Sequence, residues 1–556
     1  MFTINNTTVK DQDFANAIKN CSHLHDYIAK FVGSGYPLPT FVKKLERSDA
    51  DIKEPNLVYP IAEQVFIHIN HFSQSQDGYD EYAIIEPSEP DRDLIELADK
   101  LFAIHAGSIK PPLEVTERFN VIDQYIDRTV MVSKKPVLYE KFDASKIKTL
   151  QVYEKDLASF KYHFLRKRAG LDMLDPFLMD PHIEDISIIG AGNMYVVHKM
   201  FGALKASVYL GTEQIDDLVI GMSEQFGKTI SHAKPVVDAQ LPEGSRINIV
   251  YGKDVSRKGT NATIRRFANI PLAVTQLIQS KTMNSSQAAY LWMLLSEGMS
   301  MFINGETASG KTTTLMAITA FIPSNFKIVT LEDTPEITLP HPNWISEATR
   351  DSVSAETSVT MFDLLKAALR QRPNYIMVGE IRGAEGNTAF QAMQTGHPVM
   401  STFHAGSMTS FLQRLTSPPI GVSKTHIENL NLALFQAAVH GPNGKRMRRV
   451  LTINEILGYS ANDDKIMYVP VFNWDPPTDT VKFRGRGSSA LFQKILQLRG
   501  MSRKHESLLY DELELRAKIL DKMTEKKIFN YYDVYEAVTR CREIGLEAFM
   551  AELEGI

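Results

Sequence analysis

An eight-residue stretch near the middle of the chain has the residue types and the spacing of a phosphate-binding loop. It reads Gly305-Glu306-Thr307-Ala308-Ser309-Gly310-Lys311-Thr312 and matches the pattern GxxxxGK[ST]; we call it the P-loop and expect it to contact a nucleotide together with the following Thr313. Glycines permit backbone conformations that turn N–H groups toward a phosphate, and a helix beginning after the loop adds its dipole. Lys311 would bind the β- and γ-phosphates of ATP, and the Thr312 hydroxyl would bind Mg²⁺.

Polar side chains follow three more short apolar runs. The runs are Lys327–Leu331 before the segment from Glu332 to Glu336, Tyr375–Val378 before Gly379 and Glu380, and Val399–Phe403 before His404. In an open α/β sheet, ligands bind outside the carboxyl ends of the strands. If these runs are parallel strands of one sheet, their polar residues meet the P-loop at one edge and form an active site.

The two glutamates Glu336 and Glu380 can be given separate tasks. Cleavage of a phosphoanhydride needs a carboxylate that orients or deprotonates water and an ion that bridges the phosphates. An ordinary Walker B strand ends in Asp-Glu, but Gly379 stands at the aspartate position here. We therefore expect Glu380 to reach Mg²⁺ through a bound water, and Glu336 to activate the attacking water.

The elements that position these residues can be predicted from the apolar patterns. Met301–Asn304 is typical of a strand and Thr312–Ala320 of a helix, which is the context that a P-loop requires. Strands and helices alternate from about residue 276, as in a parallel α/β sheet. Further strands are predicted at Val65–Ile69, Tyr82–Ile85, Ile186–Ile189, Met194–Val197, Ile247–Val250 and Ala262–Ile264. Near the C-terminus, Leu509, Leu513, Ala517 and Leu520 recur at helical spacing and are expected to be packing positions.

These patterns predict an α/β protein in five parts. Residues 1–110 are expected to form a mixed N-terminal docking or regulatory domain, 111–165 a linker with helices, and 166–275 a small α+β domain. Residues 276–490 are expected to be the α/β core, and 491–556 a helical C-terminal region. The P-loop and both glutamates lie in the fourth part.

Composition excludes several classes of protein. The 556 residues carry a formal net charge of −5, which argues against a protein that binds nucleic acid by bulk positive charge. Cys21 and Cys541 stand far apart without a CxxC motif, which excludes such a zinc module and fits a reducing compartment. The N-terminus has no apolar segment of a signal peptide, and the apolar stretch Tyr290–Ile303 is too short to span a membrane. The basic run Lys445–Arg449 is expected to be a solvated strand edge.

Taken together, the motifs resemble those of one known superfamily. The Walker A box is the P-loop, the acidic box is Leu331–Glu336, the atypical Walker B is Arg372–Arg382 and the histidine box is Thr395–Ala405, and the preceding region adds Asp180–Ile186, Gly244–Asn248 and Thr263–Phe267. Over roughly residues 165–460 the chain resembles the secretion and type IV pilus ATPase superfamily. The chain resembles the archaeal branch of this superfamily in the residues of its four boxes, in its helical C-terminus and in lacking a tetracysteine module. That branch contains the archaellum motor ATPase and archaeal pilus assembly ATPases.

The resemblance implies a fold and an activity. The fold is a RecA-like P-loop NTPase core preceded by a small α+β, PAS-like domain. The activity is hydrolysis of ATP with Mg²⁺ by a homohexamer that powers assembly of a pilin-like filament, either an archaellum or an archaeal pilus, or related secretion. The location is cytoplasmic and peripheral, at the inner face of the cell membrane, where the motor works with a polytopic membrane platform protein and accessory cytoplasmic components.

The resemblance also implies roles for residues outside the P-loop. Arginines of the smaller domain reach the nucleotide in this superfamily, so Arg246 and Arg265 become candidate ligands of the γ-phosphate. His404 would sense or position groups around the phosphates. One departure is Asn374, where the superfamily usually has an aspartate.

Two other functions stay open on the sequence alone. A RecA-like motor acting on nucleic acid would share the P-loop, but it would need a basic channel with aromatic stacking residues, and the sequence shows no such clustering. No nucleic-acid partner is therefore expected. A nucleotide-gated scaffold would bind ATP and hardly hydrolyse it, and the intact Lys311, Glu336 and Glu380 argue against that interpretation.

Overall fold

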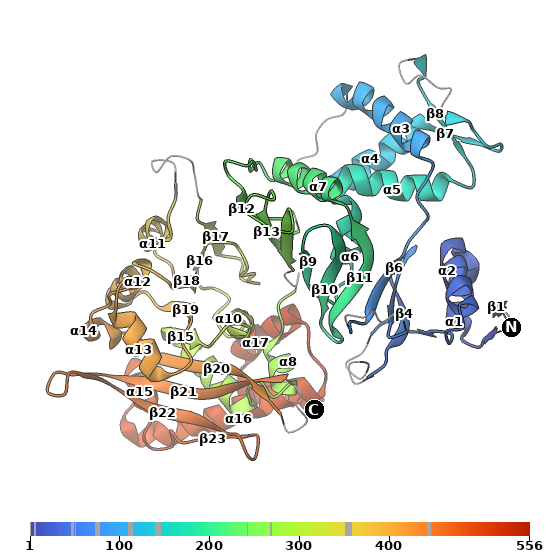
Figure 1. The fold of residues 1–556 in the computed structure, drawn as a ribbon. Helices are drawn as coiled ribbons and strands as arrows, with labels where there is room; N and C mark the ends of the chain where they lie inside the picture. The colour runs from blue at the N-terminus through green and yellow to red at the C-terminus, as the bar shows by residue number, and fades with distance from the viewer. Residues whose placement is uncertain are drawn as a thin grey trace. The chain divides into compact units, whose positions relative to one another are not determined.

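The chain folds into two compact units, Met1–Phe267 and Ala268–Ile556, in a computed structural model (Figure 1). The structure describes all residues except 1, 5–6, 46–48, 50–51, 73–77, 109–114, 140–145, 242, 267–269, 351–357, 442–445 and 556. The five-part division made from the sequence stays a prediction, since two of its boundaries lie inside the first unit and two inside the second.

The first unit is built on a ten-stranded mixed sheet with the order β12-β13-β14-β9-β10-β11-β6-β5-β4-β3. Its strands and those of two small separate sheets are β1 Phe2–Ile4, β2 Thr7–Val9, β3 Thr40–Phe41, β4 Asn56–Ala62, β5 Val65–Asn70, β6 Glu81–Ile85, β7 Val130–Ser133, β8 Leu150–Tyr153, β9 Ile183–Ile188, β10 Gly192–His198, β11 Gly202–Leu210, β12 Val236–Gln240, β13 Arg246–Val250 and β14 Asn261–Arg265. The helices are α1 Gln12–Asn20, α2 Ser22–Gly33, α3 Arg92–His105, α4 Val115–Thr129, α5 Leu157–Ala169, α6 Asp175–Met179 and α7 Thr212–Gln225. The strands predicted from the sequence in this unit are confirmed to within a few residues.

The N-terminal strands share one core with the strands of the predicted small α+β domain. Parallel pairing of β6 with β11 makes the sheet continuous, and apolar residues of β4, β5 and β6 pack in the same cluster as those of β9 to β14. Within it, the hydroxyls of Tyr59 and Tyr82 donate to the carboxylate of Asp180 at 2.6 and 2.9 Å. Burial, with Asp180 nearby, raises the pKa of both tyrosines well above the usual value, so their hydroxyls stay protonated and donate. Residues before 110 therefore help to stabilise residues after 166.

The second unit contains a nine-stranded sheet with the order β17-β16-β18-β19-β15-β20-β21-β22-β23. Its strands are β15 Met301–Asn304, β16 Ile328–Glu332, β17 Trp344–Ala348, β18 Tyr375–Glu380, β19 Val399–Phe403, β20 Leu432–His440, β21 Arg446–Ser460, β22 Lys465–Asp475 and β23 Thr480–Phe483. Its helices are α8 Val274–Gln279, α9 Ser285–Ser296, α10 Lys311–Thr319, α11 Met361–Arg370, α12 Glu385–Gln394, α13 Met408–Thr416, α14 Lys424–Ile427, α15 Ala490–Leu498, α16 Glu506–Glu525, α17 Tyr531–Ile544 and α18 Leu546–Glu554. The strands from β17 to β20 in this order pair in parallel, which confirms the predicted parallel α/β sheet.

Helices cover both faces of this sheet. On β15, Phe302 packs on the face that carries α11 to α14, whereas Met301 and Ile303 pack on the face that carries α8 to α10 and the C-terminal helices (Figure 1). Burial on both faces explains why the parallel strands are almost continuously apolar. The predicted packing positions near the C-terminus, Leu509, Leu513, Ala517 and Leu520, all lie in the core that contains Met301 and Ile303 and are confirmed.

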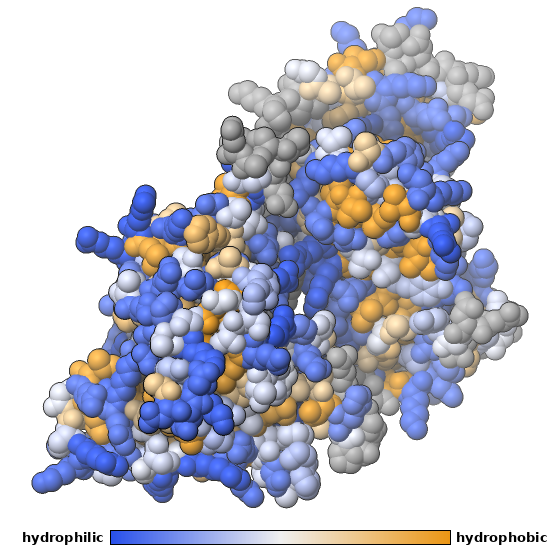
Figure 2. Space-filling view, turned by 60° about the vertical axis from the view of Figure 1, so that its left-hand side comes forward, coloured by the Kyte–Doolittle hydropathy of each residue, from blue (hydrophilic) through white to orange (hydrophobic). Residues whose placement is uncertain are grey.

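The long apolar stretch around residues 290–303 is internal to the second unit. It includes residues 290–296 of α9 and 301–303 of β15, and its apolar side chains are buried in the core. Within the described parts of the chain, no helix combines the length and the apolar composition that crossing a membrane requires. On the face drawn in Figure 2, apolar side chains form separate areas set among hydrophilic ones.

The shared core of the first unit leads to a stability prediction. Replacing Tyr82 by Phe removes a hydroxyl donor from the fully buried Asp180. Because hydrogen bonds to charged groups contribute about 1.5–3 kcal/mol, Tyr82→Phe is expected to destabilise the first unit by about that much. The measurement is hydrogen exchange of peptides that span β6 and β9, with Tyr209→Phe as the control because Tyr209 is 67% exposed. Equal exchange in the two variants would contradict the prediction.

Candidate active site

The parallel strands of the second unit bring the predicted site residues to one edge of the sheet. β19 lies between β15 and β18, and β16 lies on the other side of β18. The P-loop follows β15, Glu332 and Glu380 end β16 and β18, and His404 follows β19. The sheet therefore places these segments side by side at its carboxyl edge, as the sequence predicted.

The backbone of the P-loop has two residues in the left-handed region. Ala308 has φ 60° and Gly310 has φ 93°, and α10 begins immediately afterwards at Lys311. The Lys311 ammonium donates to the carbonyl of Glu306 at 3.1 Å, so the lysine side chain folds back over the loop. This arrangement places a cation and the first N–H groups of a helix around the same space, as phosphate binding requires.

Glu332 shapes the acidic loop that carries Glu336. Its side chain is 3% exposed and accepts from the backbone N–H groups of Glu336 at 2.9 Å and Ile337 at 3.0 Å. A buried carboxylate that accepts backbone N–H groups holds a loop in one conformation. Glu332 belongs to the acidic box, but the sequence alone gave it no role; the signal that could have found it is its place as the last residue of a strand that is otherwise apolar apart from Thr330.

Gly379, at the usual Walker B aspartate position, makes room for Glu332. A Cβ on Gly379 would lie 3.2 Å from Cγ and 3.6 Å from Oε1 of Glu332. The carboxylate from the neighbouring strand therefore occupies the space into which an aspartate at 379 would extend. This packing gives a physical reason for the atypical Walker B sequence.

Glu380 is paired with an arginine two residues further along. Arg382 donates from Nη2 to Oε2 of Glu380 at 2.6 Å, and this hydrogen bond is the main reason why the pKa of Arg382 is raised. The carboxylates of Asp333 and Glu336 raise it further. The guanidinium thus lies among the acidic residues of both strand ends, and Arg382 is a second residue whose role was not predicted from the sequence.

His404 lies directly against the start of the P-loop. Its Nδ1 is 3.0 Å from the carbonyl oxygen of Gly305. Because a carbonyl can only accept, this contact places a hydrogen on Nδ1. The carbonyl of His404 itself accepts from Arg414 of α13. The histidine is therefore held from both sides next to the loop.

Asn374 performs a structural task at the other end of the same strands. Its Oδ1 accepts from the backbone N–H of Lys327 at 2.8 Å, and its backbone N–H donates to the Lys327 carbonyl at 2.8 Å. These bonds tie the start of β18 to the start of β16. An aspartate oxygen could accept the same bond, so this contact is compatible with either residue.

The candidate arginines lie together in the first unit. Arg246 on β13 and Arg265 on β14 are directly opposite each other, and Arg265 in turn faces Asp185 on β9. Burial raises the pKa of Asp185, and Arg265 partly offsets the rise. Like charges directly opposite on a sheet repel each other, and Asp185 supplies an opposite charge beside Arg265. Contact between either arginine and the P-loop stays a prediction.

The expected solvated strand edge in the basic run is wrong for Arg449. Arg449 is 4% exposed and forms a two-pronged ion pair with Asp479 at 2.7 and 2.9 Å, which lowers the pKa of Asp479 to about 2. Arg448 is exposed, but its Nε donates to the carbonyl of Ala308 in the P-loop at 3.3 Å. Lys445 lies outside the described residues. Successive strand residues point to opposite faces, which explains the two environments.

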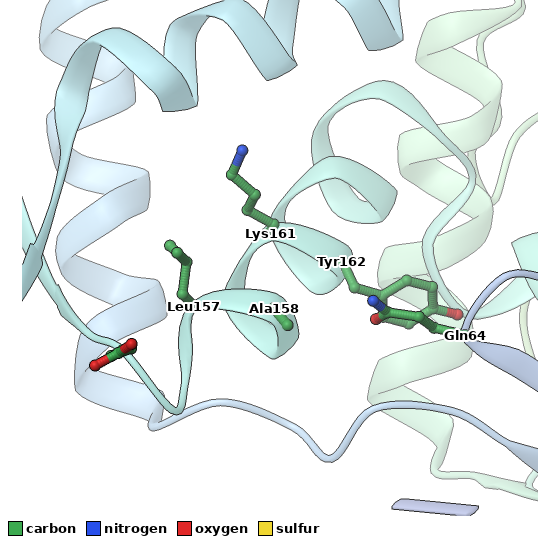
Figure 3. A pocket seen from close by; sticks show the side chains of 6 residues that line it. Gln64, Leu157, Ala158, Lys161 and Tyr162 are labelled. Carbon is green, nitrogen blue, oxygen red and sulfur yellow. The ribbon is translucent and has the colours of Figure 1, made fainter. Parts of the chain in front are cut away.

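A pocket of about 480 Å³ lies in the first unit, and none of these motif residues lines it (Figure 3). Leu157 and Lys161 extend into it from the same side of α5. Two of its polar side chains are already engaged, because Lys161 donates to Asp127 at 2.7 Å and Tyr162 donates to Glu86 at 2.8 Å.

Comparison with known proteins assigns the family. Residues 225–444 match a family described as type II/IV secretion system protein. An uncharacterised protein of Methanocaldococcus jannaschii is 41% identical over 548 residues, covering 97% of this chain and 98% of that protein. Conjugal transfer protein TrbB of Rhizobium radiobacter is 30% identical over 297 residues, covering 52% of this chain and 89% of TrbB. The chain belongs to the type II/IV secretion ATPase superfamily.

The superfamily match includes the arginine pair, the P-loop, both glutamates and His404, since all lie within residues 225–444. As a member of a family of secretion and pilus ATPases, the chain is assigned as an ATPase. The crystal structure of the ATPase DotB of Legionella pneumophila is 18% identical, with a TM-score of 0.38 over 69% of this chain and 96% of DotB. The RecA-like assignment rests on the parallel sheet order and the loop after β15.

The contact between Gly379 and Glu332 leads to a second prediction. Gly379→Asp should destabilise the second unit by about 1–3 kcal/mol through overpacking, with like-charge repulsion added. Urea unfolding followed by tryptophan fluorescence measures this selectively, because Trp292, Trp344 and Trp474 all lie in the second unit. Ala461→Asp, at an exposed turn of the same unit, is the control.

A double variant tests whether the two positions share one space. Gly379→Asp combined with Glu332→Ala should lose less stability than the sum of the two single losses, because the alanine vacates the contact. Strict additivity would show that the packing against Gly379 does not explain the glycine.

Proposed function

We propose that this chain is a Mg²⁺-dependent ATPase motor that powers assembly of a type IV pilin-like filament, an archaellum or an archaeal pilus, or related secretion. The observation that carries the proposal is the meeting of four segments at one sheet edge: the P-loop with Lys311, the acidic loop with Glu336, the β18 end with Glu380, and His404. Membership of the secretion ATPase superfamily supports it.

Each of these residues has a task that its surroundings suit. The ammonium of Lys311, whose side chain folds back over the P-loop, neutralises charge on the β- and γ-phosphates. Glu336 accepts a proton from the attacking water, and its loop is held in place by the bonds to Glu332. His404 braces the start of the P-loop through Gly305. Preorganised groups of this kind act without rearranging during the reaction.

Mg²⁺ fits the oxygen groups that the site offers. The Thr312 hydroxyl lies in the first turn of α10, and Glu380 ends β18 nearby in the sheet order. Among the described residues, no group of three or more His, Cys, Asp or Glu is placed to hold a metal ion. Magnesium commonly uses few protein ligands together with phosphates and waters, so Thr312 directly and Glu380 through water are sufficient. The ion would neutralise charge on the phosphates.

Arg246 and Arg265 would complete the site from the first unit. Two guanidiniums at opposite positions of β13 and β14 provide the charge that a γ-phosphate attracts. Because they lie on a different unit from the P-loop, their contact with the γ-phosphate would depend on closure of one unit on the other. Assembly as a homohexamer would favour that closure and couple hydrolysis to movement.

The proposed partners lie at the membrane. TrbB is named as a conjugal transfer protein, which supports a role beside a membrane machine. We place the motor in the cytoplasm, peripheral at the inner face of the cell membrane, bound to a polytopic platform protein and accessory cytoplasmic components. Residues 1–110 are the proposed docking part, because the chemistry-bearing motifs all lie after residue 240.

A motor on nucleic acid is less well supported. The basic run was the densest cluster of positive charge in the sequence, and two of its arginines are engaged inside the second unit, with Asp479 and with the P-loop. The rate of phosphate release distinguishes the motor from the nucleotide-gated scaffold, because the scaffold would bind ATP and hardly hydrolyse it.

The third prediction separates binding from hydrolysis. Lys311→Ala should weaken ATP binding, because the phosphate charge is left uncompensated. Glu336→Gln should keep the Kd for ATP within about threefold and lower kcat by about 10²–10⁴, since the amide cannot accept a proton. A fluorescent ATP analogue measures binding and a phosphate-release assay measures turnover, with Glu428→Gln on the surface of the same unit as control. Equal loss of ATP affinity in both site variants would overturn the assignment.

The fourth prediction concerns assembly. If the arginine pair acts only after closure within an oligomer, the ATPase rate per chain should rise with protein concentration. Arg265→Ala should lower kcat by about 10³ or more, as for other arginines that stabilise phosphoryl transfer, and should abolish the rise. Arg257→Ala, at an exposed position of the same unit, is the matched control. A rate per chain that stays flat while light scattering shows monomers becoming oligomers would count against the proposal.

A further inference from the structure

We propose that Gln436, on β20, is a positioning residue that holds the P-loop in its phosphate-binding conformation. The proposal rests on the proposed function only in taking a nucleotide phosphate as the ligand of the loop. Gln436 lies outside every motif of the superfamily quoted above, and β20 is the strand next to β15, on the side away from the glutamates.

The amide of Gln436 connects the loop to the helix that follows it. Gln436 is 2% exposed, its Nε2 donates to the carbonyl of Ser309 at 2.6 Å, and its Oε1 accepts from the hydroxyl of Thr314 at 2.7 Å. Because the Ser309 carbonyl can only accept, the amide nitrogen must face the loop. The hydroxyl of Thr314, on α10, then donates and fixes that orientation.

The loop needs this donor because of the way its backbone turns. Backbone N–H groups can converge on a phosphate only when the carbonyl groups of the same loop point elsewhere, and a buried carbonyl needs a donor. Ser309 is 1% exposed and lies between the two left-handed residues Ala308 and Gly310. Gln436 satisfies the carbonyl at this turn, and Arg448 donates to the neighbouring carbonyl of Ala308 at 3.3 Å.

Gln436 also packs against both glycines of the motif. A Cβ on Gly305 would lie 2.3 Å from the carbonyl oxygen of Gln436, and a Cβ on Gly310 would lie 2.9 Å from its Nε2. Contacts under 3.0 Å do not occur for real Cβ atoms. The loop therefore encloses this one residue at its beginning and at its end, and Gln436 constrains the whole turn.

The local geometry of β20 brings the side chain to this place. The register of β20 and β21 shifts between Phe435 and Gln436, and Gln436 is paired with Val450. Val450 and Leu434 pack on the sheet face that carries α10. The side chain of Gln436 consequently lies beside the first turn of α10, where Thr314 is.

This placement predicts a specific kinetic effect. The N–H groups of the loop contact the phosphates in the bound substrate and in the transition state alike, so a looser loop weakens both interactions equally. A loss of uniform binding raises KM and leaves kcat nearly unchanged. Gln436→Met, which is close in length and lacks the amide, is expected to raise the Kd for a fluorescent ATP analogue about tenfold or more with kcat within about threefold.

Hydrogen exchange provides a readout that does not depend on nucleotide. In the full chain without added nucleotide, Gln436→Met should accelerate exchange of the amides in residues 305–312. Gln287→Met is the matched control: Gln287 is a fully buried glutamine of the same unit whose side chain caps α9 by accepting from the N–H of Asn284. Its loss should lower stability and leave P-loop exchange and the Kd within about twofold.

Variants of Thr314 test the orientation of the amide. Thr314→Val removes only the hydroxyl that fixes Oε1, so it should raise the Kd in the same direction as Gln436→Met but by less. Thr314→Ser keeps the hydroxyl, so its Kd should equal that of the wild-type protein. A valine variant that behaves like the serine variant would show that the hydroxyl does not position the amide.

The outcomes separate this inference from the proposed function. If Gln436→Met matches Gln287→Met in both P-loop exchange and Kd, Gln436 is only a packing residue and the inference is overturned. If wild-type protein releases no phosphate, the proposed function fails, and the exchange comparison still decides the role of Gln436.

Discussion

The parallel pairing of β15, β19, β18 and β16 is the constraint on which the second unit depends. Strands that run in the same direction end at the same edge, so four segments far apart in the chain deliver their polar residues to one place. The pairing also requires both faces of the sheet to be buried, which the two sets of helices achieve. The site is therefore a consequence of the same hydrogen bonds that hold the core.

Several charged and polar side chains at this edge form hydrogen bonds to the backbone of the site loops and hold those loops in one conformation. Glu332 accepts from the N–H groups of the acidic loop, and Gln436 donates to the carbonyl of Ser309 in the P-loop. Each is nearly inaccessible to water, so each backbone group would lose its partner if the side chain were removed. Such residues explain how loops rich in glycine and left-handed conformations can hold one geometry, and why Gly305, Gly310 and Gly379 have no room for side chains.

The first unit is organised differently from the second. Its sheet is mixed, and its N-terminal strands contribute Tyr59 and Tyr82 to a carboxylate that belongs to the later part of the unit. Arg266, which immediately follows β14, donates to the carbonyl of the same Asp180. The segment proposed for docking and the end of the chain segment that leads to the second unit thus meet at one buried residue.

The sequence by itself determined the kind of chemistry and the strands that carry it, because the P-loop is contiguous in the chain and each strand is marked by its own apolar run. It also located Glu380 and His404 at strand ends and Glu336 in the loop after a strand. Only the tertiary structure decided what holds these residues: Glu332 against Gly379, Arg382 on Glu380, and Gln436 with Arg448 on the P-loop. The same arginine run, expected at a solvated edge, divides between the core and the P-loop because alternate residues of a strand face opposite sides. Most of these contacts join segments that are far apart in the chain, and no local pattern distinguishes a buried glutamine that binds a distant carbonyl from one that caps its own helix.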